Sequence, residues 1–225
     1  MARVAVVGGN GKVARLLHPL LVRAGHTPVA LVRDKAYGPE LEALGAEVRL
    51  LDIERETSEE FARAFAGCRA VVFSAGAGAD GKVERKRTVD LEGTLKSIEG
   101  AQQAGISRFV QLSAMGVDKP LPDDTSEVWA AYVAAKRDSD AAVRASGLDW
   151  TIVRPGALTD DPGTGLVEIA PEVERGQVPR ADVAAIIARS LDTGDGLGAQ
   201  FELVGGSTPI APALEAIAAQ SARPE

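Results

Sequence analysis

The sequence is poor in cysteine and in aromatic residues. Its one cysteine, Cys68, has no partner for an internal disulfide and no Cys or His neighbour at metal-ligand spacing. We therefore expect a buried structural thiol, no metal site and a reducing, cytoplasmic location. Aromatic residues make up only 4% of the chain, too few for a platform on which nucleic-acid bases could stack.

The chain also lacks an excess of positive charge and long apolar runs. The net charge of −7 repels polyanions, so no nucleic-acid partner is predicted. No stretch approaches the roughly 18 to 20 uncharged apolar residues that a membrane-spanning helix needs, and the N-terminus opens directly into a strand-like segment instead of a signal peptide. The expected partner is therefore a small-molecule substrate. The sequence does not distinguish a monomer from a homodimer.

The chain is rich instead in alternating strand and helix signals. Its 225 residues, 45% of them hydrophobic, are enough for one α/β domain. Strict alternation with short connections predicts a doubly wound, mostly parallel sheet with helices on both faces, a Rossmann fold. Strands are expected at 3–7, 28–32, 47–51, 70–73, 109–112, 150–153 and 200–204, and helices at 12–24, 40–44, 58–65, 83–104, 127–145, 180–191 and 209–219.

The segment 155–179 breaks this alternation. It is rich in Gly, Pro and acidic residues, which predicts loops. We expect a single domain over residues 1–225, in which 155–179 and 207–225 form a small C-terminal cap on the substrate side. The tail from residue 221 is expected to fray.

A glycine-rich turn directly follows the first predicted strand. Glycines let the backbone turn sharply and approach a pyrophosphate, and the next helix points its N-terminal amides at the anion. The strand–turn–helix context favours a dinucleotide site over the alternative of a plain tight turn. The predicted cofactor-binding residues of this turn are Gly8, Gly9, Asn10, Gly11, Lys12 and Val13.

The end of the second strand reads Val32-Arg33-Asp34. In folds that prefer NAD, an acidic residue here accepts hydrogen bonds from the adenosine ribose. Arg33 would instead present a guanidinium to the 2′-phosphate of NADP, with Lys12 as a second cation. NADP is therefore favoured over NAD. In the alternative, Arg33 faces solvent and Asp34 binds the ribose.

Two further segments are expected to contact the cofactor. Asp52, after the third strand, can accept from the adenine amino group, with Ile53 against the ring. Alternatively, Asp52 only caps the following helix. The small residues Ala75, Gly76 and Ala77 follow the fourth strand and would let the backbone approach a ribose.

The glycine turn, Arg33, the pair Tyr132-x-x-x-Lys136 and the segment Thr151-Ile152-Val153-Arg154-Pro155-Gly156 occur in the order of a known family. With them the chain resembles the atypical short-chain dehydrogenase/reductases. More narrowly it is similar to an NAD(P)H-binding subgroup described as NAD(P)-dependent epimerases or dehydratases, with NmrA-like and biliverdin/flavin reductase-like relatives. The resemblance runs from the first strand to about Ala216.

The resemblance implies roles for Tyr132 and Lys136. The lysine would hold the nicotinamide ribose, and its charge would lower the tyrosine pKa so that the phenol exchanges a proton with the substrate. Residues four apart share one helical face, so the two side chains can act together. The alternative is that Tyr132 is only a packed aromatic residue.

The rest of the family's active-site tetrad is poorly matched. Asp90 stands where an Asn is expected, and Ser113 is the candidate serine, either donating to a substrate carbonyl or bonding the cofactor. The resemblance also implies that Pro155, Gly156 and Leu158 lie beside the nicotinamide. A simple proline–glycine turn is the alternative there.

Together these features predict an oxidoreductase that transfers hydride between NADPH and a small carbonyl or quinone-like acceptor. An NAD(P)-dependent epimerase or dehydratase is a second reading. A third is a redox sensor that binds NADP(H) and acts through a protein partner without turnover.

Overall fold

The computed structural model describes residues 1–78 and 82–221, so residues 222–225 of the tail expected to fray lie outside the described residues. Its strands in the main sheet are β1 (Arg3–Val7), β2 (Thr27–Val32), β3 (Glu47–Leu50), β4 (Ala70–Phe73), β5 (Arg108–Leu112), β6 (Asp149–Pro155), β8 (Leu166–Ala170), β10 (Gln200–Gly205) and β11 (Thr208–Pro209). Their spatial order is β11-β8-β10-β6-β5-β4-β1-β2-β3. The seven strands from β10 to β3 pair in parallel, while β8 pairs antiparallel with both of its neighbours, β10 and β11.

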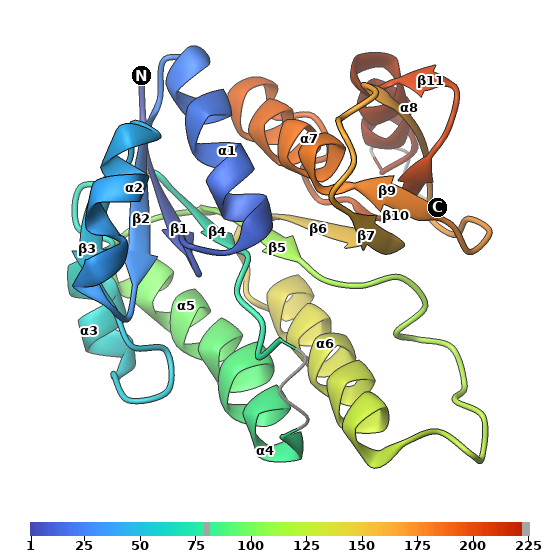
Figure 1. Cartoon of the computed structure of the whole chain (residues 1–225), viewed down its shortest axis with the longest axis horizontal. Helices are drawn as coiled ribbons and strands as arrows, with labels where there is room; N and C mark the ends of the chain where they lie inside the picture. Colours follow the sequence, from blue (N-terminus) through green and yellow to red (C-terminus); the bar gives the residue numbers. More distant parts are fainter. Residues whose placement is uncertain (79–81, 222–225) are drawn as a thin grey trace.

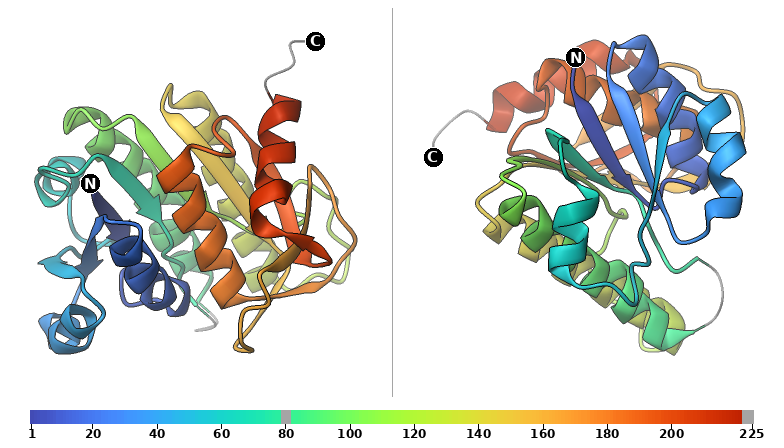
Figure 2. Two further views of the ribbon diagram at one scale, coloured as in Figure 1. Left: turned by 90° about the horizontal axis from the view of Figure 1, so that it is seen from above. Right: turned by 90° about the vertical axis from the view of Figure 1, so that its left-hand side faces the viewer.

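Helices cover both faces of this sheet (Figure 1). On one face lie α1 (Lys12–Arg23), α2 (Gly38–Ala43), α7 (Arg180–Thr193) and α8 (Ile210–Ser221). On the other lie α3 (Ser58–Ala64), the helical stretch that starts with α4 (Val83–Arg85) and ends with α5 (Glu92–Gln103), and α6 (Glu127–Ala145). The two further views show the sheet between these layers (Figure 2). The predicted doubly wound Rossmann fold is confirmed.

Alternate residues of the central strand explain the two layers. Val4 and Val6 of β1 pack into the core under α1 and α7, whereas Ala5 and Val7 pack into the core under α3 and α5. Successive side chains of a strand point to opposite faces, so a strand buried on both sides must be apolar throughout. This is why β1 reads as a continuous hydrophobic run.

Two predicted segments differ from the structure. The helix expected over 83–104 is interrupted by a π-helical turn, Lys86–Leu91, which lies between α4 and α5. The segment 155–179, expected to be loop-rich, contains β7 (Ala157–Thr159), β8 and β9 (Gln177–Pro179). β8 pairs with the distant β10, and β7 with β9 in a separate small sheet, so no local pattern revealed them.

Close helix packing yields a stability prediction at Gly100 of α5. A Cβ at Gly100 would lie 2.7 Å from the Phe61 Cβ and 3.0 Å from the Ala62 backbone nitrogen. We expect Gly100→Ala to reduce the free energy of unfolding by about 1–3 kcal/mol because α3 must move away. Gly38→Ala in α2 is the control, since nothing lies within 4 Å of its Cβ position. Equal urea midpoints for the two variants would contradict this packing.

Candidate cofactor and substrate site

The glycine turn is wedged between two neighbouring backbone segments. Gly8 has a φ of +77°, and a Cβ there would lie 2.7 Å from the Cα of Ala75. A Cβ at Gly9 would lie 2.8 Å from the Cα of Ala30 in β2. Side chains at these positions would push the turn away from β2 and from the loop after β4. The turn therefore requires glycine for steric reasons that need no bound molecule.

The start of α1 is open to an anion. Its N-cap residue, Gly11, supplies no side-chain hydrogen bond, and the first turn carries no acidic residue. The first amides of the helix thus lack a side-chain partner and retain the positive end of the helix dipole. These are the groups that would bind a pyrophosphate, so the residues present fit a dinucleotide.

A cleft of about 350 Å³ opens beside this turn. It runs from the ends of β1 and β2 to the loops after β3 and β4. Among the predicted cofactor residues it is lined by Gly8, Asn10, Gly11, Arg33, Asp52, Ile53, Ala75, Gly76 and Ala77. Ser74, which begins the predicted small-residue segment, also lines it. The sequence analysis missed the other lining residues, Leu31, Val32, Tyr37, Leu51, Glu54, Arg85 and Val89.

Arg33 and Asp34 have different surroundings at the end of β2. Arg33 is exposed and lines the cleft, and no hydrogen bond or ion pair is found for it within residues 1–78 and 82–221. The Asp34 carboxylate instead accepts from the Ala36 amide at 2.8 Å and caps a short 3₁₀ turn. Both side chains line a pocket with Asp52, and the guanidinium is the group that has no hydrogen-bond partner among the described residues.

Asp52 is held at the cleft by its own loop. Its Oδ1 accepts from the Glu54 amide at 3.0 Å. The alternative in which Asp52 caps the following helix is wrong, because Thr57 caps α3 in a reciprocal arrangement with Glu60. Ile53 fills the space over Gly93, where an added Cβ would lie 2.5 Å from its Cγ2.

Gly9, Lys12 and Val13 do not line the cleft. Gly9 packs on β2 as described, and the Val13 side chain is buried in the core, so only its backbone remains toward the turn. The Lys12 ammonium forms an ion pair at 2.6 Å with Asp160, which also pairs with Arg180 of α7 at 2.6 Å. These two cations lower the pKa of the exposed Asp160.

A buried ammonium group lies farther along the same edge of the sheet. Lys136 of α6 is 3% exposed, donates to the Leu112 carbonyl at 3.2 Å, and forms an ion pair at 3.2 Å with Asp90, which is fully buried in the π turn. Asp90 also accepts from the Ala77 amide at 3.0 Å. Burial alone would lower the pKa of Lys136, but Asp90, Tyr132 and Asp140 together outweigh the effect of burial, and the pKa is raised. The structure thus brings together Asp90, Lys136 and the loop that lines the cleft.

Tyr132 lies one helical turn before Lys136. Burial raises the pKa of its phenol; the Lys136 ammonium opposes this rise, and the carboxylates of Asp90 and Asp140 add to it. The expected net lowering by Lys136 is therefore wrong for the protein alone. The phenol keeps its proton at neutral pH, which is the form that can donate to a carbonyl oxygen. Its ring stacks at 5.2 Å on Trp129.

Ser113 follows β5 directly and is tied to a network that the sequence analysis missed. Its Oγ donates to the buried Asp140 at 2.7 Å, and the Arg154 Nε donates to the same carboxylate oxygen at 2.8 Å. Arg154 also pairs at 2.6 Å with Asp118. Burial raises the pKa of Asp140 in spite of these contacts. One signal was available, since Asp140 continues the four-residue spacing of Tyr132 and Lys136 on one helix face.

The predicted nicotinamide-side residues lie at the end of β6. The Pro155 carbonyl accepts from the Met115 amide at 3.1 Å, and the Gly156 amide donates to Leu203 at 2.9 Å. A Cβ at Gly156 would lie 2.4 Å from the Gly176 oxygen, while Leu158 packs on the core. None of these residues lines the 350 Å³ cleft.

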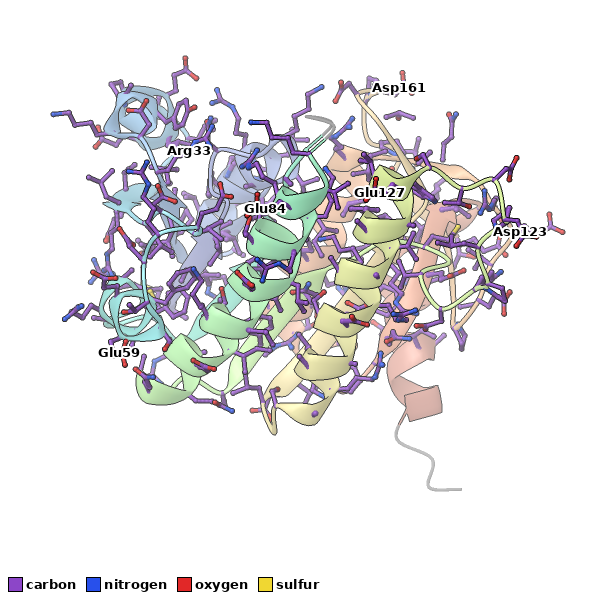
Figure 3. The ribbon with its side chains drawn as sticks, turned by 90° about the horizontal axis from the view of Figure 1, so that it is seen from below. Arg33, Glu59, Glu84, Asp123, Glu127 and Asp161 are labelled. Atoms are coloured by element: carbon purple, nitrogen blue, oxygen red, sulfur yellow. The ribbon has the colours of Figure 1, made fainter. Side chains whose placement is uncertain are left out.

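The two ends of the site are set apart across one edge of the molecule. Figure 3 labels Arg33 after β2, Glu84 in α4 and Glu127 at the start of α6, and these lie in this order across the view. The carboxyl ends of parallel strands meet at such an edge, where open α/β sheets bind their ligands. Fold, glycine turn and cleft together define a dinucleotide-binding Rossmann protein.

The sequence places it in a family. Residues 8–194 match a family described as NAD(P)H-binding, and the chain belongs to that family. This confirms the resemblance to an NAD(P)H-binding subgroup. None of the helices in the described part of the chain has the length and apolar character needed to cross a membrane.

Several relatives match over nearly their whole length. A Bacillus subtilis protein named as an uncharacterized sugar epimerase is 39% identical over 214 residues, 95% of this chain and 99% of its own. The solved structure of a Bacillus halodurans protein, provisionally named an NAD-dependent epimerase/dehydratase, is 40% identical with a TM-score of 0.89, covering 96% of this chain and 100% of its own. That of a Lactococcus lactis oxidoreductase is 27% identical with a TM-score of 0.86, covering 99% and 100%.

His18, which contacts the glycine turn, leads to a prediction of how stability depends on pH. Its buried ring Nε2 donates to the Gly9 carbonyl at 2.7 Å, and burial lowers its pKa, with a smaller contribution from Arg15. An unfolded histidine takes up a proton near pH 6.5, whereas the folded protein does so only at lower pH. The unfolded state therefore binds more protons in that interval, and stability falls as the pH drops below about 6.5.

The variant His18→Gln keeps an N–H donor for Gly9 and cannot titrate. Urea titrations at pH 7.5 and 5.5 give the free energy of unfolding of both proteins. We expect this free energy to fall more between pH 7.5 and pH 5.5 in the wild type than in the variant. All other titrating groups, including His26, are shared by the two proteins. Parallel losses in both would show that His18 does not carry this pH dependence.

Proposed function

We propose that this chain is an NADPH-dependent oxidoreductase that transfers hydride to a small carbonyl or quinone-like acceptor. The observation that carries the proposal is the buried Lys136 ammonium, which is held by Asp90 and Leu112 one turn from a protonated Tyr132. Bound NADPH would supply the hydride. A name shared with relatives does not settle the chemistry, which depends on the residues of this site.

Lys136 is suited to orient a ribose. An ammonium group has three N–H donors, and the Leu112 carbonyl and the Asp90 carboxylate account for two. The third is the donor that we assign to the nicotinamide ribose. Because the ion pair keeps Lys136 charged while buried, its field also stabilises negative charge that develops on Tyr132 during proton donation.

Tyr132 would act as the acid. As hydride reaches the carbonyl carbon, the phenol hydrogen passes to the carbonyl oxygen, and the phenolate next to Lys136 is reprotonated from solvent. Asp90 is the counter-charge of Lys136. Ser113 is assigned to the same site, next to the Leu112 carbonyl. We place Pro155, Gly156 and Leu158 beside the nicotinamide. We assign the small substrate-side cap to 155–179 and 207–225, of which 222–225 lie outside the described residues.

The preference for NADPH over NADH rests on Arg33. Its guanidinium is exposed at the end of the cleft that we assign to the adenosine, while one carboxylate oxygen of Asp34 is engaged in a backbone cap. A guanidinium binds a phosphate through paired, charge-assisted hydrogen bonds. Asp52 and Ile53 are assigned to the adenine, with Gly8 to Val13 at the pyrophosphate.

Arg33→Gln tests the cofactor preference. We expect the dissociation constant for NADPH to rise about tenfold or more and that for NADH to change little, because hydrogen bonds to a charged group contribute about 1.5–3 kcal/mol. Isothermal titration with both nucleotides gives the two constants. Arg63→Gln is the control, because Arg63 is an exposed arginine of α3 that does not line the cleft. An equal loss for both nucleotides would assign the 2′-phosphate to another residue.

Tyr132→Phe tests the acid. We expect the rate of NADPH oxidation with a carbonyl acceptor to fall by about 10²–10⁴, the range for loss of a general acid, with NADPH affinity unchanged. Quinone acceptors need less proton assistance and should lose less. If carbonyl reduction proceeds at the wild-type rate, Tyr132 is not the acid.

The names of the Bacillus relatives favour a second candidate, an NAD(P)-dependent epimerase or dehydratase. Such an enzyme returns the hydride to its own product, so the protein would copurify with a tightly held oxidised nucleotide. The departure from the family's tetrad supports a third candidate, a non-catalytic NADP(H) sensor with a protein partner. Nucleotide binding without turnover of any acceptor would favour it. In all three cases we propose a cytoplasmic monomer or homodimer.

A further inference from the structure

The orientation of the Ser113 hydroxyl bears on the choice of substrate. Ser113 stands at the carboxyl end of β5, next to Leu112, whose carbonyl accepts from Lys136. Its Oγ lies 2.7 Å from Asp140, whose charge acts on the pKa of both Tyr132 and Lys136. The serine hydroxyl thus lies among the groups assigned above to proton transfer.

The single proton of this hydroxyl is already donated in a hydrogen bond. A serine hydroxyl has one O–H donor and two acceptor lone pairs. The carboxylate of Asp140 can only accept, so the proton of the 2.7 Å contact comes from Ser113. A charge-assisted O–H to carboxylate bond is about twice as strong as a neutral one, and breaking it would leave a fully buried carboxylate oxygen with one partner fewer.

The neighbours of Asp140 keep the serine proton in place. The other group bonded to the same oxygen is Arg154, which holds Asp140 between β6 and α6. Arg154 is itself anchored by Asp118 in the loop that follows Ser113. A rotation of Ser113 toward a ligand would therefore disturb a connected set of buried charges.

We propose that Ser113 acts toward the substrate as a hydrogen-bond acceptor, so that the preferred substrates carry a hydroxyl group beside the carbonyl. This inference deepens the proposed reduction and rests on it. Hydride goes from NADPH to the carbonyl carbon, the Tyr132 proton goes to the carbonyl oxygen, and NADP⁺ and a vicinal diol are formed. The neighbouring hydroxyl donates to the Ser113 Oγ and is not changed.

Two ketones distinguish an acceptor from a donor at this position. Hydroxyacetone and methoxyacetone both have an oxygen beside the carbonyl, but only hydroxyacetone has a proton to donate. We expect the wild type to prefer hydroxyacetone, and we expect Ser113→Ala to reduce the ratio of the two kcat/KM values by about tenfold, the effect of one hydrogen bond. The readout is this ratio and not the absolute rate with either ketone, and Ser113→Thr, which restores a hydroxyl, should restore the ratio.

Two results would overturn the inference. If Ser113→Ala slows both ketones by the same factor, the serine donates to the carbonyl that they share. If the wild type and the variant have the same ratio and the same two kcat/KM values, the serine contacts neither the carbonyl nor the neighbouring hydroxyl. Thermal unfolding of Ser113→Ala and Ser113→Thr checks that both variants fold.

Absence of turnover would count against the proposed function and leave the inference testable. Ligand-detected NMR titrations of the NADP⁺-loaded protein with the two ketones then give the ratio of dissociation constants. A Ser113→Ala effect confined to hydroxyacetone supports the acceptor role. An effect of equal size on both ketones, or on neither, rejects it.

Discussion

The site is organised around one buried cation. An ammonium group in a protein interior loses several kcal/mol of hydration free energy unless charges and hydrogen bonds replace the water. Lys136 obtains both, from Asp90 in the π turn and from the Leu112 carbonyl at the end of β5. Three separate elements must therefore converge at one point for this side chain to be buried in its charged form.

The need for a buried carboxylate beside Lys136 accounts for the π turn. A π segment adds a residue to a helix and shifts its side chains, and such segments are frequent at functional sites. Here it carries Asp90, which faces Lys136 on one side and the Ala77 amide on the other. The carboxylate thereby links the charged pair to the loop that lines the nucleotide cleft, so that the two ends of the site depend on each other.

Local patterns in the sequence were sufficient for most of the fold and for the nucleotide end of the site. The sequence was sufficient to predict β1, the glycine turn and α1. A strand buried on both faces, a sharp turn and a helix start without a cap are each determined by residues that are adjacent in the sequence. Arg33 and Asp52 follow from their places at strand ends. The β8–β10 pairing was not predictable, because it is an antiparallel pairing of residues more than 30 positions apart, and β8 lies in a segment whose Gly, Pro and acidic residues predict loops.

The acid–base end was predicted less completely. Resemblance pointed to Tyr132, Lys136, Asp90 and Ser113, but not to the direction of the Ser113 proton or the net rise in the pKa of Tyr132. Both depend on Asp140 and on burial, which arise only when α6 packs on the sheet. A residue pattern identifies which groups are present, whereas tertiary packing decides which of them hold the protons.

A crystal structure of the complex with NADP⁺ tests the central assignment most directly. The account predicts a ribose hydroxyl of the nicotinamide half within hydrogen-bond distance of the Lys136 Nζ, with Asp90 still paired and C4 of the ring facing the Tyr132 hydroxyl. A nucleotide bound in the cleft with its nicotinamide ribose away from Lys136 would contradict it.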